Sequence, residues 1–154
     1  MSLAYLGLGT NLGNKAQNLH NAVTALQDET GRVLGVSSYY TSKPWGFKSE
    51  NMFLNAVVLV ETSLQPLDLL AKTQEIERKL GRTSKSADGY SDRVIDIDIL
   101  MYDNRIIDLP DLKIPHPLLA TRDFVLIPFA ELAPDLIHPL SGKSLIELRD
   151  ELIS

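Results

Sequence analysis

The sequence predicts an α+β fold in which one antiparallel sheet carries two helices on the same face. Two observations lead to this prediction. Four segments have the composition of β-strands, and two segments between them repeat apolar residues at the spacing of amphipathic helices. Their order along the chain is strand, helix, strand, strand, helix, strand. The length of 154 residues suits one domain with a full core, so we expect residues 1–154 to form a single domain.

The N-terminal part supplies three strands and the first helix. Residues 3–9, 33–40 and 53–61 are rich in β-branched, aromatic and aliphatic side chains, which favour strands. Between the first two strands, Asn14 is a candidate N-cap and Gly31 a helix terminator. The apolar stripe of this helix consists of Leu19, Ala22, Val23 and Leu26.

A second helix and a fourth strand complete the pattern. Pro66 opens the helix and Gly81 closes it, with Leu70, Ile76 and Leu80 on its apolar face. Residues 94–102 form the fourth strand. This βαββαβ order matches the ferredoxin-like motif, an antiparallel sheet with both helices on one face. Residues 122–132 and 144–152 predict two further helices in a C-terminal extension.

Two polar, turn-rich loops interrupt the pattern at residues 43–52 and 82–93. A sheet with its two helices on one side leaves the other face in need of cover. We expect these two loops to provide that cover. Loops on a rigid scaffold often carry functional residues.

Composition excludes several classes of function. The chain has no cysteine, which rules out disulfides and thiolate metal sites, and it has no apolar run long enough to cross a membrane. Its N-terminus lacks a basic signal-peptide region, so we expect a cytoplasmic protein with no membrane partner. The formal net charge of −5 argues against a generic nucleic-acid binder and favours a small anionic ligand.

Asp96 and Asp98 are the strongest candidates for chemistry. Side chains alternate along a strand, so both carboxylates point to the same face, together with Leu100 and Tyr102. Ile95, Ile97, Ile99 and Met101 are expected to point toward the helices. Taken alone, such a pair is explained more often by a solvated sheet face than by a functional site. The functional reading is a Mg²⁺ site, because Mg²⁺ takes few carboxylates and retains waters and phosphate oxygens.

Other residues could bind the remainder of a nucleotide or a planar ring. Asn55 shares a strand face with Phe53 and either bonds a neighbouring loop or holds a heterocycle, with Phe53 and Trp45 as aromatic surface. Gln74 and Glu77 share a helix face, and a solvated helix edge is the better explanation for either residue taken alone. The candidate cations for a polyphosphate are Arg82, Lys85, Arg93, His116 and Arg122. The glycines at positions 7, 9 and 13 do not have the spacing of a dinucleotide fingerprint.

Taken together, these segments resemble the 6-hydroxymethyl-7,8-dihydropterin pyrophosphokinase family of folate biosynthesis. The resemblance covers nearly the whole chain in order. The matching stretches are 5–13 (YLGLGTNLG), 53–57 (FLNAV), 73–77 (TQEIE) with 81–82 (GR), 92–100 (DRVIDIDIL), 114–117 (IPHP) and 122–126 (RDFVL).

The resemblance implies transfer of pyrophosphate from ATP to the hydroxymethyl oxygen of the pterin, with release of AMP and with two Mg²⁺ ions. It implies Asp96 and Asp98 as metal ligands and, with Arg82 and Arg93, as the catalytic set. The implied ATP-side residues are Gln74, Glu77, Arg82, Lys85, Arg93, Ile99, His116 and Arg122. The implied pterin pocket consists of Ser42, Trp45, Phe53, Asn55 and Phe124.

The chain departs from the family pattern at Lys43, Ser84 and Tyr90, where other members often carry proline, arginine and tryptophan. Two other functions remain compatible with the residues: a metal-dependent nucleotidyltransferase and a ferredoxin-like module that binds a ligand or RNA. The partners expected are small-molecule substrates, with no nucleic acid. We expect a monomer, since no spare apolar helix face is evident.

Overall fold

The structure is a computed structural model that describes residues 1–43, 52–81 and 94–154. Five strands form its main sheet: β1 (Ser2–Thr10), β2 (Gly31–Val36), β3 (Tyr40–Ser42), β4 (Phe53–Thr62) and β5 (Asp96–Tyr102). Its helices are α1 (Lys15–Glu29), α2 (Pro66–Lys79), α3 (Asp123–Leu132) and α4 (Leu145–Ile153). A short hairpin, β6 (Ile107–Asp108) and β7 (Lys113–Ile114), follows the sheet.

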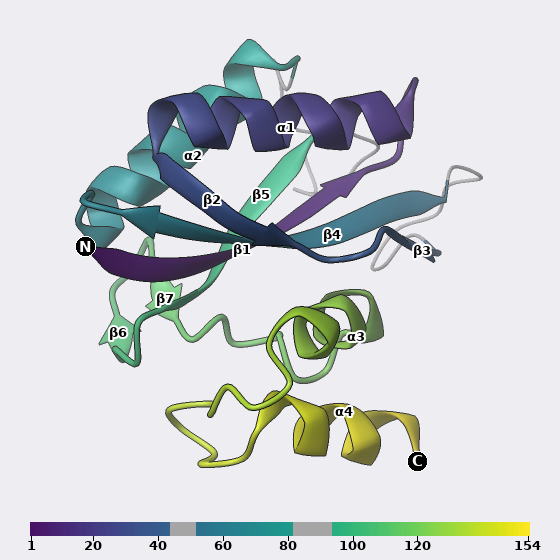
Figure 1. Cartoon of the computed structure of the whole chain (residues 1–154), viewed down its shortest axis with the longest axis vertical. Coiled ribbons are helices and arrows are strands. Elements are labelled where there is room, and N and C mark those ends of the chain that lie inside the picture. Colours follow the sequence, from purple (N-terminus) through teal and green to yellow (C-terminus); the bar gives the residue numbers. More distant parts are fainter. Residues whose placement is uncertain (44–51, 82–93) are drawn as a thin grey trace.

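The main sheet has the strand order β2-β4-β1-β5, with β3 paired to β4, and all of its pairings are antiparallel (Figure 1). The two long strands β1 and β4 therefore occupy the centre, and β5 is an edge strand. This arrangement and the βαββαβ element order confirm the predicted fold. The predicted strand 33–40 is divided into β2 and β3 by Ser37, whose hydroxyl and amide both bond the backbone of Val57.

The helices form where local signals predict them. Asn14 caps α1 by accepting a hydrogen bond from the Gln17 amide, and Pro66 occupies the first turn of α2. Both helices lie on one face of the sheet and bury a shared core with it (Figure 1). Among the residues described, no helix is both long and apolar enough to span a membrane.

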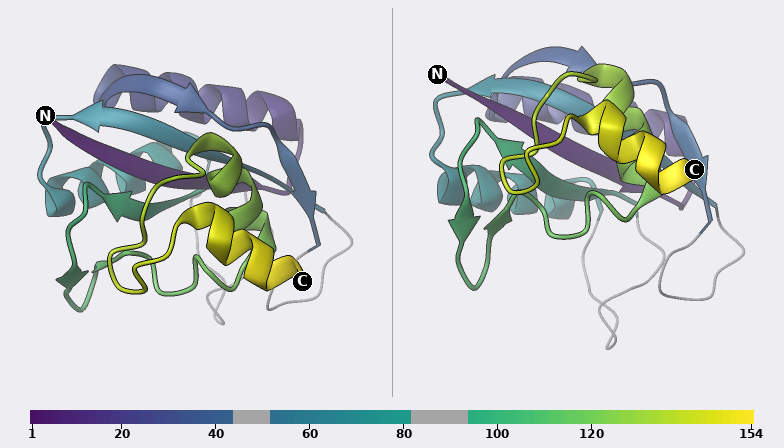
Figure 2. Two further views of the ribbon diagram at one scale, coloured as in Figure 1. Left: turned by 60° about the horizontal axis from the view of Figure 1, so that its bottom comes forward. Right: turned by 90° about the horizontal axis from the view of Figure 1, so that it is seen from below.

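The opposite face of the sheet is covered by α3 and α4 (Figures 1 and 2). Leu126 and Phe129 of α3 and Leu145 of α4 are fully buried in a second core on that side. Among the described residues, the C-terminal extension supplies this cover, because its helices carry the apolar side chains that the sheet needs. The expectation that the two polar loops also cover this face stays a prediction, since residues 44–51 and 82–93 lie outside the described residues.

The register of β5 differs from simple alternation after Ile99. Leu6 pairs with Ile99, whereas Tyr5 pairs with Met101, so the ladder contains a β-bulge at this point. Two consecutive side chains, Leu100 and Met101, consequently belong to the core under α3, and Tyr102 returns to the core under α1 and α2. The prediction that Met101 faces the two N-terminal helices and that Tyr102 shares the aspartates' face is wrong for this reason.

Candidate active site

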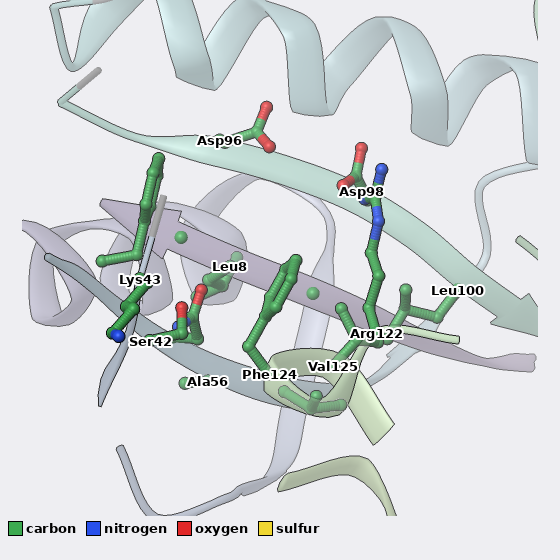
Figure 3. Close-up of a pocket in the computed structure, with 15 residues that line it drawn as sticks. Leu8, Ser42, Lys43, Ala56, Asp96, Asp98, Leu100, Arg122, Phe124 and Val125 are labelled. Atoms are coloured by element: carbon green, nitrogen blue, oxygen red, sulfur yellow. The ribbon is translucent and has the colours of Figure 1, made fainter. Parts of the chain in front are cut away.

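A pocket opens on the sheet face that carries α3. Its empty space, including the open mouth, is about 640 Å³. It lies between the strands β1, β4 and β5 and the start of α3 (Figure 3). Its lining residues are Gly7, Leu8, Gly9, Ser42, Lys43, Phe53, Asn55, Ala56, Val57, Asp96, Asp98, Leu100, Arg122, Phe124 and Val125.

Two glycines of the central strand β1 form the floor of this pocket. A Cβ atom on Gly9 would lie 3.3 Å from Oδ1 of Asn55 and 3.6 Å from Cδ1 of Phe53. A Cβ on Gly7 would lie 3.4 Å from the Leu100 side chain. The pocket exists because these two positions carry no side chain. Sequence reasoning missed both as site residues, although a Gly-x-Gly pair inside a strand signals close approach of another group.

Asn55 is held by the short strand β3. It is 4% exposed, and its Nδ2 donates to the Tyr40 carbonyl oxygen at 2.9 Å and to the Ser42 hydroxyl oxygen at 2.8 Å. The simpler sequence interpretation, a bond to a neighbouring backbone, is correct for the amide nitrogen. With both amide hydrogens committed to β3, the carbonyl oxygen Oδ1 is turned toward Gly9 at the pocket floor.

Asp96 and Asp98 are half-buried and line the pocket from the edge strand β5. Figure 3 shows both carboxylates on the same side of β5, with the Arg122 side chain reaching up toward Asp98. Within the described residues, no cluster of three or more His, Asp or Glu side chains is arranged to hold a metal ion. Two carboxylates alone suit Mg²⁺, which completes its octahedron with waters and phosphate oxygens.

Several residues implied on the ATP side do not line the pocket, among them Gln74, Glu77 and Ile99. Gln74 is exposed on α2. Glu77, one turn further, is 8% exposed, and its Oε2 accepts a hydrogen bond from the backbone amide of Ile97 at 2.8 Å. The side chain of Ile99 is 4% exposed and belongs to the core under α1 and α2.

His116 is a neutral imidazole fixed beside β5. Its backbone amide donates to the Leu100 carbonyl oxygen at 2.9 Å, and its Nδ1 accepts from the Leu118 amide at 3.1 Å. Burial lowers the pKa of His116 to about 4, with a further contribution from the positive charge of Arg122, and the negative charge of Asp96 opposes this shift. The proton of the neutral ring therefore lies on Nε2, which makes His116 a hydrogen-bond donor at neutral pH.

The start of α3 forms the wall of the pocket that faces the sheet. The Arg122 guanidinium carbon lies 5.8 Å from the centre of the Phe124 ring, and Figure 3 shows that ring in the middle of the pocket. Tyr40 of β3 donates a hydrogen bond to the Asp123 carboxylate. Burial first, and then the charge and hydrogen bond of Asp123, raise the pKa of Tyr40. This contact joins α3 to the strand that holds Asn55.

The sequence model of the family described as 7,8-dihydro-6-hydroxymethylpterin-pyrophosphokinase (HPPK) matches residues 5–134 of the chain. The chain belongs to the HPPK family. A 2-amino-4-hydroxy-6-hydroxymethyldihydropteridine pyrophosphokinase of Porphyromonas gingivalis is 48% identical over 141 residues, which cover 90% of this chain and 95% of the relative. A protein of the same name from Aquifex aeolicus is 40% identical over 151 residues, covering 98% and 92%.

Solved structures support the HPPK fold. The wild-type HPPK-DHPS of Plasmodium falciparum has a TM-score of 0.79 at 16% identity, covering 97% of this chain and 44% of that one. The same protein with SDX-DHP has a TM-score of 0.80 at 18% identity, covering 98% and 43%. The chain thus spans less than half the length of these structures. Likeness at this identity concerns the fold.

The structure brings together seven of the eleven described residues that the HPPK resemblance implies. Ser42, Phe53, Asn55, Asp96, Asp98, Arg122 and Phe124 all line one pocket. Trp45, Arg82, Lys85 and Arg93 lie outside the described residues, as do Ser84 and Tyr90. Lys43, which departs from the family pattern, is exposed and contributes to the pocket lining. Sequence reasoning had not included it, nor Leu100 and Val125, in the site.

Proposed function

We propose that this pocket is the active site of a pyrophosphokinase that transfers pyrophosphate from ATP to the hydroxymethyl group of 6-hydroxymethyl-7,8-dihydropterin and releases AMP. The observation that carries the proposal is the composition of one pocket. An amide and an aromatic ring lie at one side, and two carboxylates on an edge strand lie at the other. Membership of the HPPK family, whose relatives are named as pyrophosphokinases, supports the same reaction.

The pterin would occupy the space above Gly7 and Gly9. A flat bicyclic ring needs close approach to the sheet, which these two positions permit. Phe124 offers an aromatic surface within the pocket, and Phe53 lines it from β4. The Asn55 carbonyl oxygen is a rigid acceptor for a ring N–H, because β3 holds the amide from behind. In this proposal Ser42 supports Asn55, and Trp45 completes the aromatic surface.

ATP would bind on the β5 side with its phosphates against Asp96 and Asp98, which would hold two Mg²⁺ ions. Bound there, the two ions would neutralise the triphosphate and align it with the pterin alcohol. Arg122 adds a fixed positive charge, and neutral His116 offers its Nε2 proton to a phosphate oxygen. The remaining ATP-side residues in the proposal are Gln74, Arg82, Lys85, Arg93 and Ile99.

The reaction itself is an in-line displacement. The hydroxymethyl oxygen of the pterin forms a bond to the β-phosphorus, the bond from that phosphorus to the α–β bridging oxygen breaks, and AMP leaves. The chain's own contribution is positioning and charge. The walls of the pocket orient the alcohol, while Arg82, Arg93 and Arg122 stabilise negative charge on the transferring group.

The proposal also includes a monomeric enzyme formed by one domain over residues 1–154, acting in the cytoplasm without nucleic acid. The chain's own helices bury both faces of the sheet, which supports a monomer. An RNA-binding sheet would instead present stacking aromatics on its central strands. Here β1 presents Gly7 and Gly9, β5 presents carboxylates, and Phe53 of β4 is the single aromatic residue among the strand residues that line the pocket. Light scattering on a gel-filtration column tests the oligomeric state.

Product analysis tests the reaction. The protein is mixed with ATP, Mg²⁺ and 6-hydroxymethyl-7,8-dihydropterin, and the products are separated by chromatography. AMP and a pyrophosphorylated pterin are expected. Free pyrophosphate with a nucleotidylated product would instead indicate the nucleotidyltransferase alternative.

The Asp98→Ala variant tests the role of the carboxylates. We expect it to lose turnover while its circular dichroism spectrum and urea unfolding remain those of the folded protein, because Asp98 is only half-buried. A near-native rate in this variant would exclude the metal-ligand assignment.

A further inference from the structure

Glu77 is a buried carboxylate at the C-terminal end of α2. It lies in the last turn of α2, which ends at Lys79, where the partial negative charge of the helix terminus disfavours an anion. It is 8% exposed, and burial of a carboxylate is costly unless hydrogen bonds satisfy it. The group that such a carboxylate bonds therefore indicates what its burial serves.

One hydrogen bond of Glu77 goes to a residue that lies between the two aspartates in sequence. Its Oε2 accepts the Ile97 backbone N–H at 2.8 Å, and this bond is buried. Ile97 itself is anchored, since its side chain is 5% exposed in the core under α1 and α2. A carboxylate acceptor makes the bond stronger than one between neutral groups.

This bond completes the support of an edge strand. Backbone groups of successive strand residues point to opposite edges, so an Ile97 amide facing α2 places the amides of Asp96 and Asp98 on the β1 side. There the register sets Asp96 opposite Gly9 and Asp98 opposite Gly7. The segment that carries both carboxylates is thus held by β1 on one edge and by Glu77 on the other.

We propose that Glu77 is a positioning residue that sets the separation and direction of the Asp96 and Asp98 carboxylates through the backbone of Ile97. Glu77 does not line the pocket, so this role differs from the nucleotide contact implied by the family resemblance. The inference rests on the proposed function, because it takes the carboxylate pair to bind divalent cations together with the phosphates of ATP. Residues that orient metal ligands in this way commonly control metal affinity.

Two substitutions distinguish the effect of the Glu77 hydrogen bond to Ile97 from the effect of the Glu77 charge. Glu77→Gln removes the charge and retains an oxygen acceptor for the Ile97 amide, whereas Glu77→Leu removes both. Glu75→Gln is the matched control, since Glu75 lies on the same helix and pairs with Lys72 and Lys79 at the surface. The first measurement is hydrogen exchange of the Ile97 amide by NMR in metal-free protein. The second is the affinity for Mn²⁺ in the presence of a non-hydrolysable ATP analogue, by calorimetry.

Glu77→Gln and Glu75→Gln should retain both the Ile97 protection and the Mn²⁺ affinity of the wild type. Glu77→Leu should lose the protection and weaken Mn²⁺ binding by roughly 10–100-fold, the usual effect of removing a residue that supports metal ligands. Unchanged Ile97 protection in Glu77→Leu would overturn the proposal. So would a Glu77→Gln variant that binds Mn²⁺ as weakly as Glu77→Leu while its Ile97 amide stays protected, because charge would then explain the effect.

Two further outcomes remain decisive. If Glu77→Leu lacks a native circular dichroism spectrum, the Ile97 amide of the wild type and of Glu77→Gln decides the question, and rapid exchange in both overturns the proposal. Failure of the wild type to release AMP with the dihydropterin would instead overturn the proposed function. That failure would leave the exchange measurement valid, because it is made without metal or nucleotide.

Discussion

At the scale of single residues, the site depends on two glycines without side chains as much as on its polar residues. Gly7 and Gly9 leave the floor of the pocket open. The Asn55 amide donates both of its hydrogens to β3, so its carbonyl oxygen faces that floor. These small features carry more of the pocket's shape than its charged residues do. They lead to a direct test of where the ring of the substrate lies.

Gly9→Val should block the pocket. Gly9 has a backbone that a strand residue can adopt, since it is not among the glycines with positive φ, but its Cβ would lie 3.3 Å from Asn55 Oδ1. We expect the KM for the pterin to rise by at least roughly tenfold, with little change in the affinity for ATP. Leu3→Val, at an exposed position of β1, is the control. An unchanged pterin KM in steady-state kinetics would place the ring elsewhere.

The titration of His116 should be visible in stability. Its pKa is about 4 in the folded protein against 6.5 for the free side chain, so between these values the unfolded chain binds more protons. The contribution of neutral His116 is fully present above pH 6.5 and is lost as the pH falls toward 4. Between pH 7.5 and 4.5, metal-free wild type should lose on the order of 2 kcal/mol more unfolding free energy than His116→Gln. Urea unfolding measures both, and equal losses would contradict the shift.

At the scale of elements, the two C-terminal helices have a double role. The start of α3 brings Arg122 and Phe124 over the pocket, and its buried face packs on the sheet together with α4. The helix α4 begins with a capping box in which Ser144 accepts from the Glu147 amide while the Glu147 carboxylate accepts from Ser144. This motif is readable in the sequence, whereas the surface that α4 covers is not.

Ser144→Ala should therefore weaken the cover of the sheet. Loss of an N-cap costs about 1 kcal/mol, so we expect the urea midpoint to fall without a change in the slope of the transition. Ser63→Ala, at an exposed site before α2, is the matched control and should stay within about 0.5 kcal/mol of the wild type. If both variants unfold alike, the capping box contributes nothing to stability.

At the scale of the whole molecule, one sheet separates two hydrophobic cores that support different parts of the structure. The core under α1 and α2 supports the back of the sheet, and the core under α3 and α4 supports the wall of the pocket. Leu26 of α1 and Leu126 of α3 are both fully buried, one in each core. They make a matched pair of substitutions.

Leu26→Ala and Leu126→Ala should each destabilise the protein by about 2–5 kcal/mol, as buried Leu→Ala changes do. Only Leu126→Ala should weaken pterin binding, because it loosens the helix that carries Phe124. Urea unfolding gives the stabilities, and calorimetry under conditions where both variants are folded gives the affinities. Equal pterin affinity in the two variants would mean that packing under α3 does not position the pocket wall.

Local signals in the sequence determined the order of strands and helices, the starts of α1 at Asn14 and of α2 at Pro66, and the shared face of Asp96 and Asp98. Each depends on neighbours along the chain, through the period of a strand or the hydrogen bonds of a helix end. The tertiary structure alone decided that α3 and α4 cover the second face, that a bulge redirects Met101 and Tyr102, and that Glu77 reaches Ile97. These features depend on which distant segments pair and pack. A one-residue change of register between two strands does not alter the pattern of apolar residues in the sequence of either strand, so the sequence does not predict it.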